Sequence, residues 1–184
     1  MALTESTMLE LGTPAPEFSL PDVISGKNLS LADLGGAKAL AIFFICAHCP
    51  YVKHIEQGIA TLAHDYAGKS VRFVAISSND AVTNPEDAPA GLREQAERLQ
   101  FNFPYLYDES QEVAKAFQAA CTPDIFLFDA NLKLAYRGQF DSSRPGNNIP
   151  VTGEDVRFSL VQLLHNQPVP DDQIPSIGCN IKWK

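Results

Sequence analysis

Two cysteines separated by two residues, Cys46 and Cys49, have the types and spacing best suited to chemistry in this sequence. They follow an apolar run over residues 39–45, and they precede a segment with apolar residues at three- and four-residue spacing. The two patterns predict a buried strand that ends at the first cysteine and a helix that begins after the second. Unpaired N–H groups and the helix dipole at such a junction favour a thiolate. The pair therefore predicts a dithiol that can switch to a disulfide.

Within this pair we expect Cys46 to be the attacking thiolate, because it is predicted to lie nearer the helix N-terminus and to be more exposed. Cys49, one turn in, would then be the resolving thiol that releases a mixed disulfide. A protonated His48 beside the thiolate would stabilise the reduced form and make the disulfide more oxidising. The alternatives are two inert thiols or half of a zinc site, with a solvated loop histidine between them.

The composition suits one globular domain, since 45% of the 184 residues are hydrophobic and 20% are charged. The formal net charge of −8 argues against nucleic acid or an anionic membrane as the main partner. The first six residues lack the basic and apolar regions of a secretory signal, which predicts a cytoplasmic location. Four cysteines in such a chain fit catalysis or metal binding better than a structural disulfide framework.

The remaining patterns predict an α/β protein with a central mixed sheet flanked by helices. We expect a lead-in over residues 1–13 that is loosely held, a domain over residues 14–167, and a tail over residues 168–184 that docks on it. The expected elements are a hairpin over 17–21 and 28–31, a strand over 71–76, a surface loop over 79–89, helices over 92–99 and 114–119, a hairpin over 125–128 and 132–137, and a helix over 156–164.

This order, with the two cysteines at the first strand–helix junction, resembles the thioredoxin fold over about residues 14–165. Thioredoxin-like proteins carry a cis-proline before the third core strand, and Thr122-Pro123 occupies the matching place. The resemblance implies that Pro123 is cis and that the Thr122 edge is open to an extended substrate. The segment Gly12-Thr13-Pro14-Ala15-Pro16-Glu17-Phe18 narrows the resemblance to the AhpC/TSA (peroxiredoxin-like) family. Residues 46–53, 121–124 and 178–184 are similar to a peroxiredoxin-like group that carries a CxxC motif.

The sequence departs from the peroxiredoxin motif Pro-x3-Thr-x2-Cys. If Cys49 is aligned with the peroxidatic cysteine, the threonine and proline positions hold Cys46 and Ile42. If Cys46 is aligned instead, those positions hold Phe43 and Ala39. The usual form of peroxide reduction is therefore disfavoured.

Three more residues have a possible part in the chemistry. The resemblance places Arg137 where the family's peroxide-polarising arginine is expected, and the alternative is a solvated arginine at a strand edge. Cys121 is expected near the dithiol and can pair with Cys179 if the tail folds back. The alternatives are that Cys121 is a buried small hydrophobic residue and that Cys179 is an ordinary tail thiol. The loop over residues 141–148 can form a rim of the site.

These observations favour a thiol–disulfide oxidoreductase that uses a Cys46–Cys49 dithiol/disulfide, supported by His48, Thr122 and Pro123. Its expected partners are a protein or small-molecule disulfide and a thioredoxin- or glutathione-type reductant, with no cofactor. One alternative is an atypical peroxiredoxin-like thiol peroxidase, an antioxidant that reduces hydroperoxides. A second alternative is a carrier or sensor of a soft metal such as Cu(I) or Zn. Peroxiredoxin-like folds often dimerise, so a homodimer is also expected.

Overall fold

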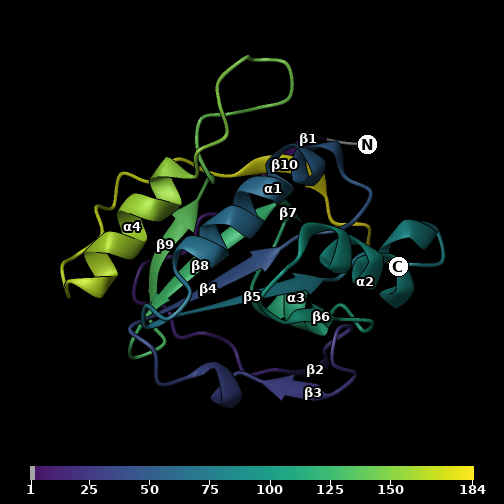
Figure 1. Ribbon diagram of the computed structural model, residues 1–184, viewed down its shortest axis with the longest axis horizontal. Helices are drawn as coiled ribbons and strands as arrows, with labels where there is room; N and C mark the ends of the chain where they lie inside the picture. Colours follow the sequence, from purple (N-terminus) through teal and green to yellow (C-terminus); the bar gives the residue numbers. More distant parts are fainter. Residues whose placement is uncertain (1–2) are drawn as a thin grey trace.

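The computed structural model describes residues 3–184 and is built around a five-stranded mixed sheet (Figure 1). The sheet has the order β6-β5-β4-β8-β9, with β4 at its centre. The strands are β1 (Leu3–Glu5), β2 (Ser19–Pro21), β3 (Asn28–Ser30), β4 (Ala39–Phe44), β5 (Val71–Ser77), β6 (Tyr105–Tyr107), β7 (Cys121–Thr122), β8 (Asp124–Asp129), β9 (Leu134–Gly138) and β10 (Ile177–Asn180). The helices are α1 (Pro50–Asp65), α2 (Pro89–Leu99), α3 (Glu112–Ala116) and α4 (Glu154–Leu164), with short 3₁₀ helices η1 (Ala32–Leu34) and η2 (Pro85–Asp87).

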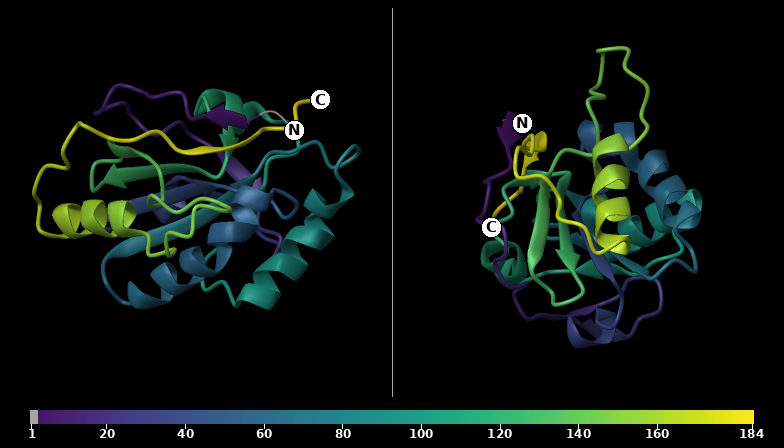
Figure 2. Two further views of the ribbon diagram at one scale, coloured as in Figure 1. Left: turned by 90° about the horizontal axis from the view of Figure 1, so that it is seen from above. Right: turned by 90° about the vertical axis from the view of Figure 1, so that its left-hand side faces the viewer.

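The central strand β4 is buried on both faces because elements cover the sheet on each side. Ala41 and Phe43 point into a core shared with α1, α2 and α4. Leu40, Ile42 and Phe44 alternate with them and face α3 and the β2–β3 hairpin. Strands β5 and β6 run parallel within the sheet, whereas β8 runs antiparallel to both β4 and β9. Figure 2 shows this layering from two further directions. The predicted mixed α/β architecture is confirmed.

From Leu3 onward the N-terminal lead-in is not loosely held, which corrects the expectation from sequence for the described residues. Strand β1 pairs antiparallel with β10, so that Leu3 lies opposite Cys179 and Glu5 opposite Ile177. Further along the lead-in, the main-chain N–H of Gly12 donates to the carbonyl of Leu134 at 2.7 Å. Such pairing depends on contacts across most of the chain and leaves little local signal in a three-residue strand.

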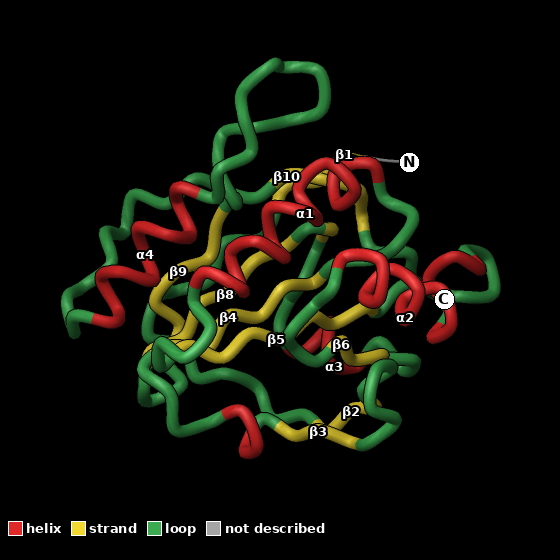
Figure 3. Tube along the Cα trace, viewed as in Figure 1, coloured by secondary structure: helices red, strands yellow, loops and turns green. Residues whose placement is uncertain are grey.

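The C-terminal tail contains β10, the middle strand of a second, three-stranded sheet with the order β1-β10-β7 (Figure 3). Strand β7 leads directly into the cis bond between Thr122 and Pro123 and then into β8. The small sheet therefore brings both ends of the described chain to the end of the main sheet where β4 gives way to α1. Among the described residues, no helix combines the length and the apolar character needed to span a membrane.

Candidate active site

Three sulfur atoms meet at the junction between β4 and α1. Cys49 is the N-cap of α1, and Cys46 lies in the turn that precedes it. The Cys49 Sγ lies 2.7 Å from the Sγ of Cys179 and 3.2 Å from the main-chain carbonyl oxygen of Thr122. The Cys46 Sγ lies 3.5 Å from the hydroxyl oxygen of the same Thr122. None of these cysteines is in a disulfide, so the site holds three thiols around one threonine.

The Thr122–Pro123 bond is cis, as the resemblance implies. The edge of Thr122 is not open, however, which corrects the second part of that expectation. Strand β10 pairs with β7 in a register that sets Cys179 opposite Thr122. The edge that was expected to receive a substrate is therefore occupied by the protein's own tail.

The relative positions of Cys46 and Cys49 also differ from the expectation. Both residues are fully buried, so Cys46 is not the more exposed thiol. Helix α1 begins only at Pro50, so Cys49 and not Cys46 lies at its N-terminus. The strand ends at Phe44, and the intervening turn holds Cys46 further from the helix.

The three thiols differ in the ease with which they ionise. The pKa of Cys49 is lowered to about 4, chiefly by a hydrogen bond from the Cys46 thiol, with smaller contributions from Cys179 and the main-chain N–H of Val52 that outweigh burial. Burial, the hydrogen bond to Cys49 and the charge of Asp87 hold the pKa of Cys46 well above its ordinary value. Burial and the neighbouring Cys49 raise the pKa of Cys179 to about 12. The favoured thiolate is therefore Cys49.

His48 is held by a carboxylate and is not a solvated loop histidine. Its Nδ1 lies 2.5 Å from the Oδ2 of Asp87, and its side chain is 14% exposed. The hydrogen bond to Asp87 raises the pKa of His48 against the opposing effect of burial. The same Nδ1 lies 3.8 Å from the Cys46 Sγ, so protonation of the ring would place a positive charge beside the thiols.

Asp87 is the residue of this site that sequence reasoning missed. It is fully buried and accepts four hydrogen bonds, from the main-chain N–H groups of Ala47 (2.8 Å) and His48 (3.1 Å), from the His48 ring, and from the Asn79 amide (2.8 Å). Burial raises the pKa of Asp87, but the hydrogen bonds from His48 and Asn79 outweigh it and lower the pKa overall. Most of the expected surface loop over residues 79–89 is exposed or half-buried, but Asp87 points inward and accepts hydrogen bonds from the main chain of the CxxC turn.

One group of side chains at this site has the ligand types of a metal centre. Atoms of Cys46, His48 and Asp87 that can bind a metal lie within 4.8 Å of one another. The two Asp87 oxygens already accept four hydrogen bonds, and one of these comes from the same His48 nitrogen. A metal ion at this point would have to displace that network. The geometry therefore favours a hydrogen-bonded turn over a ligand set.

Arg137 fits neither of the two alternatives considered for it. It is fully buried on β9, where its Nη2 donates to the Asp124 carboxylate at 3.0 Å and to the Gln118 carbonyl at 2.7 Å. Its guanidinium also lies over the ring of Phe126. Within residues 3–184, no contact links Arg137 to the Cys49 sulfur. It is therefore part of an internal ion pair and neither solvated nor placed at the thiols.

Cys121 does not pair with Cys179 as the sequence allowed. In the register of β7 and β10, Cys121 lies opposite Asn180, while Cys179 faces Cys49. The Cys121 thiol donates to the Pro123 carbonyl at 3.4 Å, and burial raises its pKa. Cys121 therefore behaves as a buried small residue.

The loop over residues 141–148 projects beyond α4 and β9 at the top of Figure 1. The hydroxyl oxygen of Ser143 in this loop lies 2.7 Å from the Nε2 of His54 on α1, and the two form a hydrogen bond. Ser143 and Arg144 line a small cleft together with Tyr51 and Pro123. The loop thus lies at the rim of the site, beside the cis-proline.

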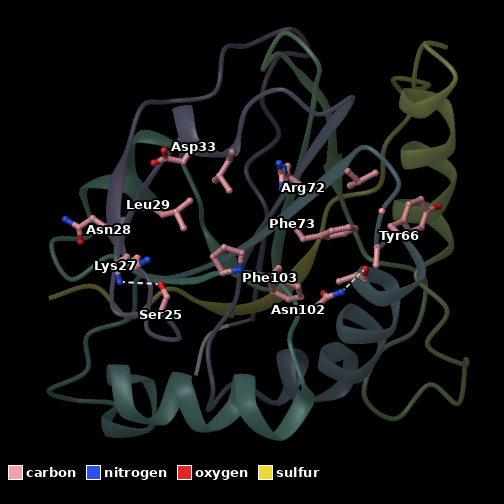
Figure 4. A pocket seen from close by; sticks show the side chains of 16 residues that line it. Ser25, Lys27, Asn28, Leu29, Asp33, Tyr66, Arg72, Phe73, Asn102 and Phe103 are labelled. Carbon is pink, nitrogen blue, oxygen red and sulfur yellow. Dashed lines mark hydrogen bonds between the residues drawn. The ribbon is translucent and has the colours of Figure 1, made fainter.

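A larger cavity, of about 600 Å³, lies elsewhere in the described chain (Figure 4). Its lining includes Val71, at the beginning of β5, and the aromatic rings of Tyr66, Phe73 and Phe103. Because β4 and β5 run parallel, the beginning of β5 and the end of β4 lie at opposite ends of the sheet. This cavity is therefore separate from the thiols.

Comparison with known proteins identifies one matching family and two solved structures that resemble the whole chain. The profile described as "AhpC/TSA family" matches residues 11–137. The crystal structure of an "uncharacterized conserved protein" from Geobacillus kaustophilus is 55% identical and superposes with a TM-score of 0.98, covering 100% of this chain and 97% of that chain. A hypothetical protein from Sinorhizobium meliloti is 46% identical with a TM-score of 0.96, covering 98% of each chain.

More distant relatives have names that refer to sulfur chemistry. A Mycobacterium tuberculosis protein named "Putative peroxiredoxin" is 32% identical over 117 residues, which are 64% of this chain and 69% of that protein. The thiol-disulfide oxidoreductase ResA of Geobacillus thermodenitrificans is 28% identical over 131 residues, covering 71% of this chain and 70% of that protein. The two names differ in the reaction, but both describe oxidoreductases.

Proposed function

Because the chain belongs to the AhpC/TSA family, we propose that it is a thiol–disulfide oxidoreductase that works through Cys46 and Cys49. Its relatives include proteins named as a putative peroxiredoxin and as a thiol–disulfide oxidoreductase. The observation that carries this proposal is the position of Cys49 at the N-cap of α1, where its thiolate is stabilised beside a second thiol. Because its pKa is low, Cys49 supplies the attacking sulfur, and Cys46, with two residues between it and Cys49, supplies the resolving sulfur.

The order of attack in this proposal is the reverse of the one expected from sequence. The Cys49 thiolate attacks one sulfur of a substrate disulfide, which forms a mixed disulfide and releases the other sulfur as a thiolate that takes up a proton. Cys46 then loses its proton and attacks the Cys49 sulfur. This step forms the Cys46–Cys49 disulfide and releases the reduced substrate thiol.

His48 and Asp87 support this chemistry without reacting themselves. The His48 imidazolium, held by Asp87, places a positive charge beside sulfurs that must carry negative charge. The same Asp87 fixes the main-chain N–H groups of Ala47 and His48, and so sets the shape of the turn between the two cysteines. We expect a thioredoxin- or glutathione-type reductant to restore the dithiol after each turnover.

The proposal is tested with insulin as a disulfide substrate and dithiothreitol as the electron donor. The wild-type protein is expected to accelerate insulin reduction, Cys46→Ser is expected to slow it, and Cys49→Ser is expected to return it to the uncatalysed rate. Cys121→Ala removes a thiol that lies outside the proposed reaction and is the matched control. Because the Cys179 sulfur lies 2.7 Å from Cys49, the double variant Cys46→Ser, Cys179→Ser should trap a mixed disulfide on residue 49 with 5,5′-dithiobis(2-nitrobenzoate). Insulin reduction that survives Cys49→Ser would refute the mechanism.

A peroxidase is the second candidate, and one observation favours it. If Cys49 is aligned with the family's peroxidatic cysteine, a second sulfur lies 2.7 Å from it, at Cys179. Against it, Cys46 replaces the motif threonine, and Arg137 is engaged by Asp124 instead of facing the thiols. Stopped-flow mixing of the reduced protein with micromolar hydrogen peroxide separates the two candidates. Oxidation no faster than that of a free thiol rejects the peroxidase, whereas much faster oxidation favours it.

A further inference from the structure

The mechanism above leaves one buried sulfur at the site without a role. Cys179 lies on β10, which pairs with β7 so that Cys179 faces Thr122 and Asn180 faces Cys121. Strand β7 ends at the cis-proline, beside both cysteines of the CxxC turn. The C-terminal strand therefore forms main-chain hydrogen bonds at the edge next to the reacting sulfurs.

The position of the Cys179 sulfur matches what an incoming substrate sulfur requires. An extended peptide that adds to a strand edge presents alternate side chains to the protein beneath it. Strand β10 does this at β7, and the side chain that it directs to the site is a thiol with its Sγ 2.7 Å from the Cys49 Sγ. The tail thus occupies the place of a substrate strand and carries a sulfur at the reacting position.

Contacts on both sides of Cys179 fix the strand in this place. Gly178 has no side chain, and a Cβ there would collide with the Thr122 carbonyl oxygen, so glycine permits the close approach of β10. Before it, the Ser176 hydroxyl donates to the Pro123 carbonyl at 2.7 Å. After it, the main-chain N–H of Lys182 donates to the Asn79 side chain at 2.8 Å. Asn79 is also a donor to Asp87, so the tail shares a hydrogen-bond network with the CxxC turn.

We propose that Cys179 is a third redox-active residue, which accepts the disulfide from Cys46–Cys49 by attack at Cys49. This inference rests on the proposed function, because that reaction supplies the Cys46–Cys49 disulfide. The Cys179 thiolate attacks the Cys49 sulfur, the Cys46–Cys49 bond breaks, and a Cys49–Cys179 bond forms. The proton lost by Cys179 is taken up by Cys46, which leaves as a thiol. The exchange moves a disulfide within the protein and therefore needs no further oxidant.

The exchange gives the disulfide two locations in one chain. In the first, the disulfide lies within the turn between β4 and α1. In the second, it ties β10 to the N-terminus of α1 and returns Cys46 to the thiol form. The second location covalently closes the edge of β7, so the tail would also keep a peptide substrate away from an enzyme that is already oxidised.

The test is disulfide mapping after oxidation of the reduced protein with a limiting amount of diamide. Remaining thiols are alkylated, and trypsin then separates the cysteines, because Cys46 and Cys49 share the peptide 39–53, Cys179 lies in 158–182 and Cys121 lies in 116–133. We expect wild-type protein to give an internal disulfide in 39–53 together with a cross-link between 39–53 and 158–182. In Cys46→Ser the cross-link should become the main intramolecular disulfide, and in Cys49→Ser it should be lost.

The same maps tell a failure of this inference from a failure of the proposed function. An internal 39–53 disulfide in the wild type, with no cross-link to 158–182 in either the wild type or Cys46→Ser, overturns the role of Cys179 and leaves the oxidoreductase intact. A cross-link that survives in Cys49→Ser, or one between 116–133 and 158–182, also overturns it. Absence of the internal disulfide together with absence of insulin reduction overturns the proposed function itself. Because the presence or absence of the cross-link in the wild-type chain gives the main result, the test can be decided even if a variant fails to fold.

Discussion

Replacing the buried carboxylate of the site, by Asp87→Asn, is expected to destabilise the protein by about 3 kcal/mol at pH 6. Asp87 accepts four hydrogen bonds, and the single carbonyl oxygen of asparagine can keep only the two from the main chain of Ala47 and His48. The bonds from the His48 ring and the Asn79 amide are lost. A hydrogen bond to a charged group contributes about 1.5–3 kcal/mol, and the lower end applies because part of the His48 side chain is exposed.

The penalty should depend on pH because the pKa of His48 is raised by Asp87. A raised pKa in the folded state stabilises the protein below the ordinary histidine pKa of 6.5, and this stabilisation disappears as the pH rises through the folded value. The lowered pKa of Asp87 adds stability above the ordinary carboxyl pKa, and this is lost only in acid. The difference in the free energy of unfolding between wild type and Asp87→Asn should therefore be larger at pH 6 than at pH 9.

Urea unfolding under reducing conditions, followed by circular dichroism at both pH values, measures this difference. Glu86→Gln is the matched control, because it removes a neighbouring carboxylate that forms only an exposed ion pair with Lys53 at 3.4 Å. Exposed pairs contribute little, so the control should change the free energy of unfolding by no more than about 0.5 kcal/mol. The reasoning is refuted if the two variants unfold at the same urea concentration at pH 6. A penalty of equal size at pH 9 would refute the part assigned to the His48 charge.

Three further predictions concern the thiols, the internal ion pair and the tail. Thiolate absorbance near 240 nm should persist in the reduced protein down to about pH 4 and be lost at neutral pH in Cys49→Ser, because the pKa of Cys49 is lowered to about 4. Asp124→Asn should lower the free energy of unfolding by about 3–5 kcal/mol in urea titrations, since it leaves the buried Arg137 without its counter-charge. Gly178→Ala should reduce the hydrogen-exchange protection of β10 amides, because the new Cβ collides with the Thr122 carbonyl.

Each of these three has a control within the chain. Cys121→Ser should keep the thiolate absorbance, because burial raises the pKa of Cys121. Glu112→Gln removes an exposed partner of Lys115 and should change stability by no more than about 0.5 kcal/mol. Gly35→Ala places a Cβ in ordinary contact, 3.4 Å from its nearest neighbour, and should leave β10 protected. A variant that behaves like its control contradicts the corresponding prediction.

Local sequence patterns were sufficient to predict the elements that carry the CxxC motif. The apolar run at 39–45 became β4, buried on both faces, and the apolar spacing after Cys49 became α1. Such patterns report burial directly, because a strand covered on both sides must be apolar throughout. The place of the cis bond at Pro123 followed from a family resemblance and not from the local chemistry of the residues.

Two partners of the site were beyond the reach of local patterns. Asp87 lies 39 positions from His48, in a loop whose prolines and acidic residues are equally typical of a solvent-exposed loop. Cys179 lies 130 positions from Cys49, in a four-residue strand with little apolar character of its own. Strand pairing at that separation depends on the whole fold, so the sequence left two alternatives for Cys179, a disulfide with Cys121 or an ordinary tail thiol.

The sequence by itself determined that a dithiol stands between a buried strand and a helix, because strand, helix and spacing are properties of neighbouring residues. Only the tertiary structure decided which sulfur is the thiolate and which third sulfur faces it. The pKa of a thiol depends on the sum of burial, helix N–H groups and charges, and these reach Cys46 and Cys49 from segments far apart in the chain. The contact between Cys49 and Cys179 depends on the register of β10, which is set when the tail folds back onto β7.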